Sequence, residues 1–103
     1  MNIPTEVANY FAEGKKRLIS ITPHSDFELI LKFDDGSTRL YKLKNKLTGV
    51  LSALLNVNKF NQVFIDENGN IAWDIDDNID SSVVWSNRID LCADNAYIYS
   101  IKL

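Results

Sequence analysis

The sequence predicts a small α+β domain in which antiparallel β-hairpins pack with an N-terminal helix and a short central helix. Two turn signals, Asp35-Gly36 and Asn68-Gly69, each lie between β-type segments and predict hairpins. Helical periodicity occurs near the N-terminus and again around residues 48–56. The chain of 103 residues suits a single domain, residues 1–103, with one hydrophobic core.

The first predicted element is an N-terminal helix within residues 1–16. Pro4 favours its first turn and Gly14 its end. The apolar residues that share one helical face are Ile3, Val7, Tyr10 and Phe11. Three cations follow at positions 15–17; we interpret them as a solvated helix end, with an anion-binding patch as the alternative.

A β-hairpin is the next predicted unit. The β-formers of residues 18–22 predict a strand that ends at Pro23. Apolar and polar residues then alternate over residues 27–33, as in a half-buried strand. Residues 34–37 form the turn, and residues 38–43 the returning strand.

A short amphipathic helix is predicted over residues 48–56, with Thr48 as its N-cap. The leucines at helical spacing are Leu47, Leu51, Leu54 and Leu55, and we expect them in the core rather than in an exposed groove.

Strands follow at residues 60–65 and 71–75, joined by a turn at residues 66–70, so a second hairpin is expected. Residues 74–82 read as a polar loop. A short strand is predicted at residues 83–85, one helical turn at residues 92–95, and a final strand at residues 97–103.

Charge is distributed unevenly along the chain. Residues 1–59 carry nine Lys and Arg against six Asp and Glu, whereas residues 60–103 carry two against eight. Residues 60–87 contain no Lys or Arg. This acidic segment is therefore the strongest polarity feature that the chain offers to a partner.

The sequence argues against several functional classes. Cys92 is the only cysteine, which fits a reducing compartment, most simply the cytoplasm. No secretory signal or membrane-spanning segment is predicted. One Cys and one His cannot supply a zinc site, and the isolated glycines form no phosphate loop, so we expect no metal or cofactor. His24 lies in a predicted turn without a triad pattern, and we expect Cys92 to be a small buried hydrophobe. The chain is therefore not expected to be an enzyme; an enzyme of unrecognised type that uses Cys92 or a pair of acids is the third hypothesis.

The acidic loop resembles the start of a calcium-binding loop, but it lacks two residues that such a loop requires. Asp74, Asp76, Asn78 and Asp80 alternate as calcium ligands do. Ile79 stands where the glycine of the turn belongs, and Trp85 where the closing glutamate belongs. The alternative without a function in binding is a solvated loop whose Asp and Asn side chains cap its own turns.

The two tryptophans and the lysines allow further readings. Trp73 and Trp85 suit a core, or the rim of an interface. Basic residues cluster in the middle of the chain, and a nucleic-acid-binding regulator that uses the basic hairpin face is therefore the alternative function, although the low pI disfavours it. These residues are Lys32, Arg39, Lys42, Lys44, Lys46 and Lys59.

An ordered set of short motifs resembles the bacterial domain-of-unknown-function family 2442 over residues 18–98. The motifs are Leu29 to Phe33, Asp35-Gly36, Arg39-Leu40-Tyr41, Phe60-Asn61-Gln62-Val63, Ile65-Asp66, Gly69, Ile71-Ala72-Trp73-Asp74, Val84-Trp85-Ser86-Asn87, Ile89-Asp90-Leu91-Cys92 and Asp94 to Tyr97. The N-terminal helix precedes the usual start of the family, and the segment between the two tryptophans is longer than in short members.

The resemblance implies a small α+β module with no established catalytic role. Members of the family occur beside a second small protein in a toxin–antitoxin-like pairing, and others are fused to a helix-turn-helix domain. The leading hypothesis is therefore a non-catalytic protein-interaction module, antitoxin-like or regulatory, whose partner is a small protein. The residues expected to contact that partner are Asp74, Asp76, Asp77, Asp80 and Trp85.

Overall fold

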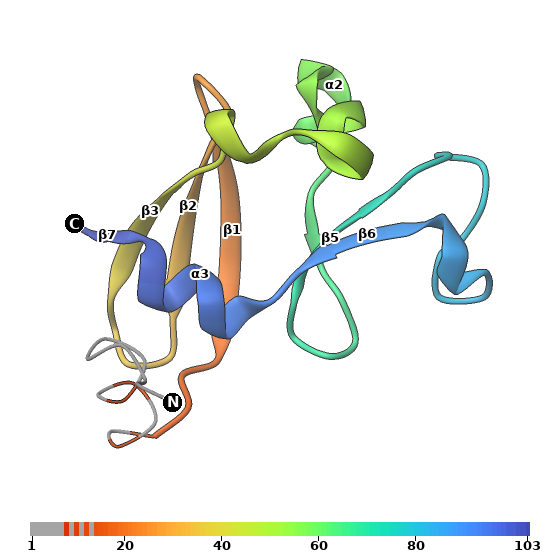
Figure 1. The fold of residues 1–103 in the computed structure, drawn as a ribbon. Coiled ribbons are helices and arrows are strands. Elements are labelled where there is room, and N and C mark those ends of the chain that lie inside the picture. The colour runs from red at the N-terminus through yellow and green to blue at the C-terminus, as the bar shows by residue number, and fades with distance from the viewer. Residues whose placement is uncertain (1–7, 9, 11, 13) are drawn as a thin grey trace.

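The computed structural model describes residues 8, 10, 12 and 14–103, and it has an α+β architecture with two antiparallel sheets (Figure 1). Residues 8, 10 and 12 are helical. The rest of the predicted N-terminal helix up to residue 13 lies outside the described residues, and residues 14–16 are not helical. No helix in the described ranges is long and apolar enough to cross a membrane.

The larger sheet has four strands in the order β1-β2-β3-β7, all antiparallel. The strands are β1 (Leu18–His24), β2 (Glu28–Phe33), β3 (Thr38–Lys42) and β7 (Ile101–Lys102). The smaller sheet has the order β4-β5-β6, with β4 (Phe64–Ile65), β5 (Ile71–Asp74) and β6 (Arg88–Leu91). The two sheets meet where β1 contacts β4.

Short helices connect and cover these strands. Two 3-10 helices, η1 (Lys44–Lys46) and η2 (Gly49–Leu55), lead into the single turn of α2 (Val57–Phe60). A third, η3 (Trp85–Asn87), precedes β6. Helix α3 (Ala93–Tyr99) then crosses the larger sheet before β7 (Figure 1).

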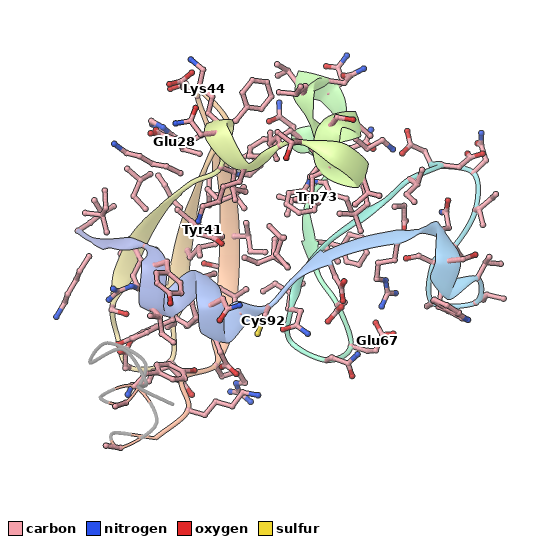
Figure 2. All side chains as sticks on the ribbon, viewed as in Figure 1. Glu28, Tyr41, Lys44, Glu67, Trp73 and Cys92 are labelled. Carbon is pink, nitrogen blue, oxygen red and sulfur yellow. The ribbon has the colours of Figure 1, made fainter. Side chains whose placement is uncertain are left out.

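The core lies between the two sheets and the short helices. Leu29, Leu31 and Phe33 alternate along β2 and are at most 1% exposed, so the period-two pattern of residues 27–33 is confirmed. Trp73 of β5, labelled in Figure 2, is fully buried, and its indole N–H donates to the carbonyl of Phe60 at 2.9 Å. That hydrogen bond satisfies the polar atom of the largest core side chain.

The first hairpin is confirmed at its predicted turn. The amide of Phe33 donates to Ser37 O at 3.1 Å, and the amide of Gly36 donates to Phe33 O at 3.1 Å. Gly36 has φ +84°, a left-handed conformation that glycine adopts without a steric cost. The pairing of β4 with β5 around Gly69, at φ +79°, confirms the second hairpin as well.

Strand β1 differs from its prediction because it continues through Pro23 to His24. Proline is tolerated there because β1 is an edge strand of its sheet, where the missing amide donor leaves no neighbour unpaired. The pairing register of β1 also shifts between Leu18 and Ser20. The bulge leaves Ile19 exposed.

The predicted central helix at residues 48–56 is a 3-10 helix rather than an α-helix. Thr48 provides no side-chain cap, and Gly49 has φ +59°. Asn56 then begins α2, because its side-chain oxygen accepts from the amides of Asn58 and Lys59. Of the four predicted core leucines, Leu55 is half-exposed, so its expected burial is wrong.

Four further predictions need correction. The segment 60–65 is a strand only at Phe64–Ile65, because Phe60 ends α2. Residues 83–85 are a turn that runs into η3 rather than a strand. The strand β6 was not predicted, and α3 extends through Tyr99, so the final strand is only β7.

Candidate functional site

The predicted contact residues lie in and beside the segment that connects β5 to β6, residues 75–87, called here the 75–87 loop. In Figure 1 this loop is at the far right, on the opposite side of the molecule from β7. The loop contains no Lys or Arg. Its geometry follows from two groups of side chains, one that holds the loop together and one that faces solvent.

Asn87 holds the two ends of the loop together. Its side-chain oxygen accepts from the amide of Asp76 at 2.9 Å, and its Nδ2 donates to the carbonyls of Asp76 and Ile79 at 2.9 and 2.7 Å. Its own carbonyl accepts from the amide of Ile75 at 2.7 Å. Asn87 is 8% exposed, so these bonds satisfy a buried amide side chain.

Two of the predicted acidic residues cap turns within the loop. Asp76 accepts from the amide of Asn78 at 2.9 Å. Asp80 accepts from both the amide and the hydroxyl of Ser82, at 2.9 and 2.6 Å, and these bonds keep the pKa of Asp80 below its usual value. Asp76 and Asp80 are therefore exposed acids with a local structural role.

Asp74 and Asp77 are tied together by Lys59 of α2. The Lys59 ammonium donates to the carbonyl of Asp74 at 2.9 Å and forms a short ion pair with the carboxylate of Asp77. The hydrogen bond from Lys59 lowers the pKa of Asp77. Asp74 is only partly exposed, and its Oδ1 is buried without a hydrogen-bond partner among the residues that the structure describes. Asp74 is thus less accessible than the other four predicted residues.

Apolar side chains make up much of the exposed surface of the 75–87 loop. Trp85 is 82% exposed and Val83 is 79% exposed, in contrast to the fully buried Trp73. The core alternative therefore holds for Trp73, and Trp85 lies on the surface. The other exposed apolar members are Ile75, Ile79 and Val84. Exposed aromatic and aliphatic groups of this kind are typical of interaction surfaces.

No sequence pattern indicates that Asn87, Lys59 or Val83 belongs to this site. Asn87 and Lys59 reach the acidic residues only in the folded chain. Asn87 is 11 residues from Asp76 in the sequence, and Lys59 is 18 residues from Asp77. Val83 was assigned to a strand because β-branched residues favour strands, and the sequence offered no sign that this apolar run faces solvent.

Most basic residues of the alternative nucleic-acid surface contact their own chain. Lys32 and Lys42 do share the outer face of the larger sheet, opposite Thr38 and Glu28 respectively. The remaining four have intramolecular partners: Arg39 lies over the Tyr97 ring and donates to Ser100, Lys44 pairs with Asp26, Lys46 lies over Tyr41, and Lys59 pairs with Asp77.

The two groups considered for catalysis lie apart from the 75–87 loop. His24 ends β1, and its Nδ1 lies 3.2 Å from Glu28 and 3.5 Å from the hydroxyl of Ser25. Cys92 is exposed just before α3, so its expected burial is wrong. No group of three or more His, Cys, Asp or Glu side chains in the described ranges is arranged to hold a metal ion.

Comparison with known protein families gives a match over most of the chain. The model of a family described as "Protein of unknown function (DUF2442)" matches residues 18–100. This range covers most of the chain and agrees with the resemblance expected over residues 18–98. No curated protein and no solved structure matches the chain.

Proposed function

The chain belongs to this DUF2442 family of proteins of unknown function, and on that premise we propose that it is a non-catalytic protein-interaction module, the antitoxin-like or regulatory partner of a small protein. The observation that carries the proposal is the exposed apolar surface of the 75–87 loop, centred on Trp85 and Val83. Burying such side chains against a partner removes apolar area from water, which is the main favourable term in protein association.

The internal hydrogen bonds of the loop support this proposal. Asn87, Asp76 and Asp80 fix the backbone through bonds of 2.7–2.9 Å. A loop that is already ordered loses less conformational entropy when it binds, so more of the contact energy becomes affinity. Trp85 is the proposed anchor of the surface.

The acidic residues favour a partner with a cationic rim. Asp76, Asp77 and Asp80 are exposed beside the apolar surface, and no cation within the loop neutralises them. Lys59 offsets only Asp77. Charges at the rim of an interface mainly affect the association rate and the choice of partner. We assign Asp74 a supporting place beneath this rim. We also propose that the protein acts in the cytoplasm, since its only cysteine is an exposed thiol.

The first experiment is capture of the partner from the native host with the tagged protein, followed by calorimetry with the purified partner. Val83→Ala and Val50→Ala form a matched pair, because both residues are valines and are 79% and 85% exposed. Val50 belongs to η2 rather than to the loop. We expect Val83→Ala to weaken binding several-fold and Val50→Ala to leave it unchanged. Equal affinities for the two variants would refute the assigned surface.

The double variant Asp76→Asn/Asp80→Asn separates the effect of charge from that of loop structure. Asn in place of Asp76 and Asp80 keeps a side-chain oxygen that can accept the turn hydrogen bonds, but it removes the negative charge. The double variant should reduce the association rate with a cationic partner and make that rate less sensitive to salt. An unchanged rate and salt dependence would show that the acids serve only the turns.

A further inference from the structure

A second concave site lies away from the 75–87 loop, between the segment that enters β1 and the turn from β4 to β5. It is a cleft of about 500 Å³. One side is formed by residues 15–18, the other by residues 65–70, and Ala93 at the start of α3 completes it. Its volume is within the range of small-molecule sites. Glu67 marks the turn side of this cleft in Figure 2. The cleft and the 75–87 loop share no residue.

The first side of the cleft is cationic, and its backbone is held in place. The amide of Arg17 donates to the carboxylate of Asp34 at 2.9 Å, and the amide of Asp34 donates back to the carbonyl of Arg17 at 2.8 Å. The guanidinium of Arg17 has no hydrogen bond or ion pair with another described residue. Within the described part of the chain, Lys15 has only a long ion pair, 3.9 Å, with Asp94, and its side chain is 70% exposed. Both cations remain available to a ligand.

Lys16, between these two residues, has a different role. It is 9% exposed, and its ammonium lies 5.2 Å from the centroid of the Tyr10 ring and 5.6 Å from that of Tyr97. These contacts stabilise its buried charge within the fold. Lys16 therefore adds positive potential to the cleft without being a proposed ligand contact.

The acidic residues on the opposite side are partly engaged by the protein itself, although Oδ2 of Asp66 is buried without a hydrogen-bond partner among the described residues. Arg88 lies 2.7 Å from Glu67 and 3.6 Å from Oδ2 of Asp66. The hydrogen bond with Arg88 lowers the pKa of Glu67. The other oxygen of Asp66 accepts from the amides of Asn68 and Asn70, both at 2.9 Å. Arg88 therefore compensates part of the negative charge at this side of the cleft.

The remaining surface of the cleft is mixed: the amides of Asn68 and Asn70 line it together with three apolar residues. Leu18 and Ala93 are 4% and 6% exposed and belong to the core, and Ile65 packs against the same core. A ligand that fits this arrangement has a charged end and an apolar body. We propose that the cleft binds a small organic anion, with its charged group at Lys15 and Arg17 and its apolar body mainly against Ile65, beside the small exposed parts of Leu18 and Ala93.

The test is a titration of the 15N-labelled protein, followed by NMR, with phenyl phosphate, benzoate and the neutral benzyl alcohol. Either anion should cause saturable shifts of the amides of Gly69 and Ala93, and which anion binds more tightly tells whether a phosphate or a carboxylate is preferred. The alcohol should bind at least tenfold more weakly, since it lacks the charge-assisted contacts. No saturable shift with either anion up to about 10 mM, or equal binding of the alcohol, would overturn the proposal.

Matched variants assign the binding to the cleft. The double variant Lys15→Gln/Arg17→Gln should lose at least tenfold in affinity for the anion. The control, Lys32→Gln/Lys42→Gln, removes the same charge from the outer face of the larger sheet and should bind as tightly as the wild type. Equal losses in both double variants would mean that net charge, rather than this cleft, attracts the anion.

Discussion

Replacing Trp85 with alanine should leave the stability of the fold nearly unchanged and remove most of the affinity for the proposed partner. Trp85 is 82% exposed, so folding covers less than a fifth of this residue. An aromatic side chain buries about 150–250 Å² when it is fully covered. At about 25 cal/mol per Å², the covered part contributes about 1 kcal/mol or less to the free energy of unfolding.

The exposed part of Trp85 is the part that a partner would bury. About 160 Å² at the same coefficient corresponds to about 4 kcal/mol, which is an upper value because binding also orders side chains. Truncation of a central interface residue typically costs about 2–4 kcal/mol. We therefore expect the Kd of the complex to rise by between about 30-fold and several hundred-fold.

Two assays check the two halves of this expectation. Urea unfolding should give wild-type stability within about 1 kcal/mol for Trp85→Ala, whereas Trp73→Ala should lose about 3–5 kcal/mol, because Trp73 is fully buried and hydrogen-bonded to Phe60. Calorimetry with the purified partner should then show the weakened Kd for Trp85→Ala. A loss of more than about 2 kcal/mol of stability, or an unchanged Kd, would refute the reasoning.

Four further expectations concern the described structure. Asn87→Ala should destabilise the fold by about 2 kcal/mol in urea unfolding, because it leaves backbone groups of the loop unpaired. At the exposed Asn78, the same substitution should cost under about 0.5 kcal/mol. Equal costs would contradict the role of Asn87 in holding the loop together. Gly36→Ala should cost about 1–2 kcal/mol at φ +84°, and a neutral result would mean that the turn relaxes. Burial, and after it the hydrogen bond to Asp94, raises the pKa of Tyr10 from about 10 to about 12. The stabilising contribution of Tyr10 should therefore be complete below pH 10 and be lost as the pH rises toward 12. Tyr10→Phe should flatten this part of the curve of stability against pH, and an unchanged slope would contradict the raised pKa. For the alternative function, we expect no saturable binding to duplex DNA at about 50 mM salt, and tight, salt-dependent binding would favour the hairpin lysines instead.

The sequence predicted those parts of the fold that depend on local chemistry. The turn at Asp35-Gly36 needs a left-handed residue, and glycine supplies it wherever the rest of the chain goes. The alternation along β2 similarly requires one buried face, and that face holds the core. Both predictions were confirmed because they rest on short-range geometry.

Predictions that depend on tertiary context were less successful. Val83 and Val84 have strand propensity, yet the amides of both donate to the carbonyl of Asp80 in a turn. A free cysteine is a small apolar residue that is usually buried, but Cys92 lies exposed at the junction of β6 and α3. The bracing of the 75–87 loop by Asn87 and Lys59 depends on contacts across many residues, which no sequence pattern indicates.

Hydrogen–deuterium exchange of the protein with and without its purified partner tests the central claim most directly. The proposal predicts that binding slows exchange in the 75–87 loop, with the largest change near Val83 and Trp85. Unchanged exchange in this loop, together with new protection on the outer face of the larger sheet around Lys32 and Lys42, would contradict it.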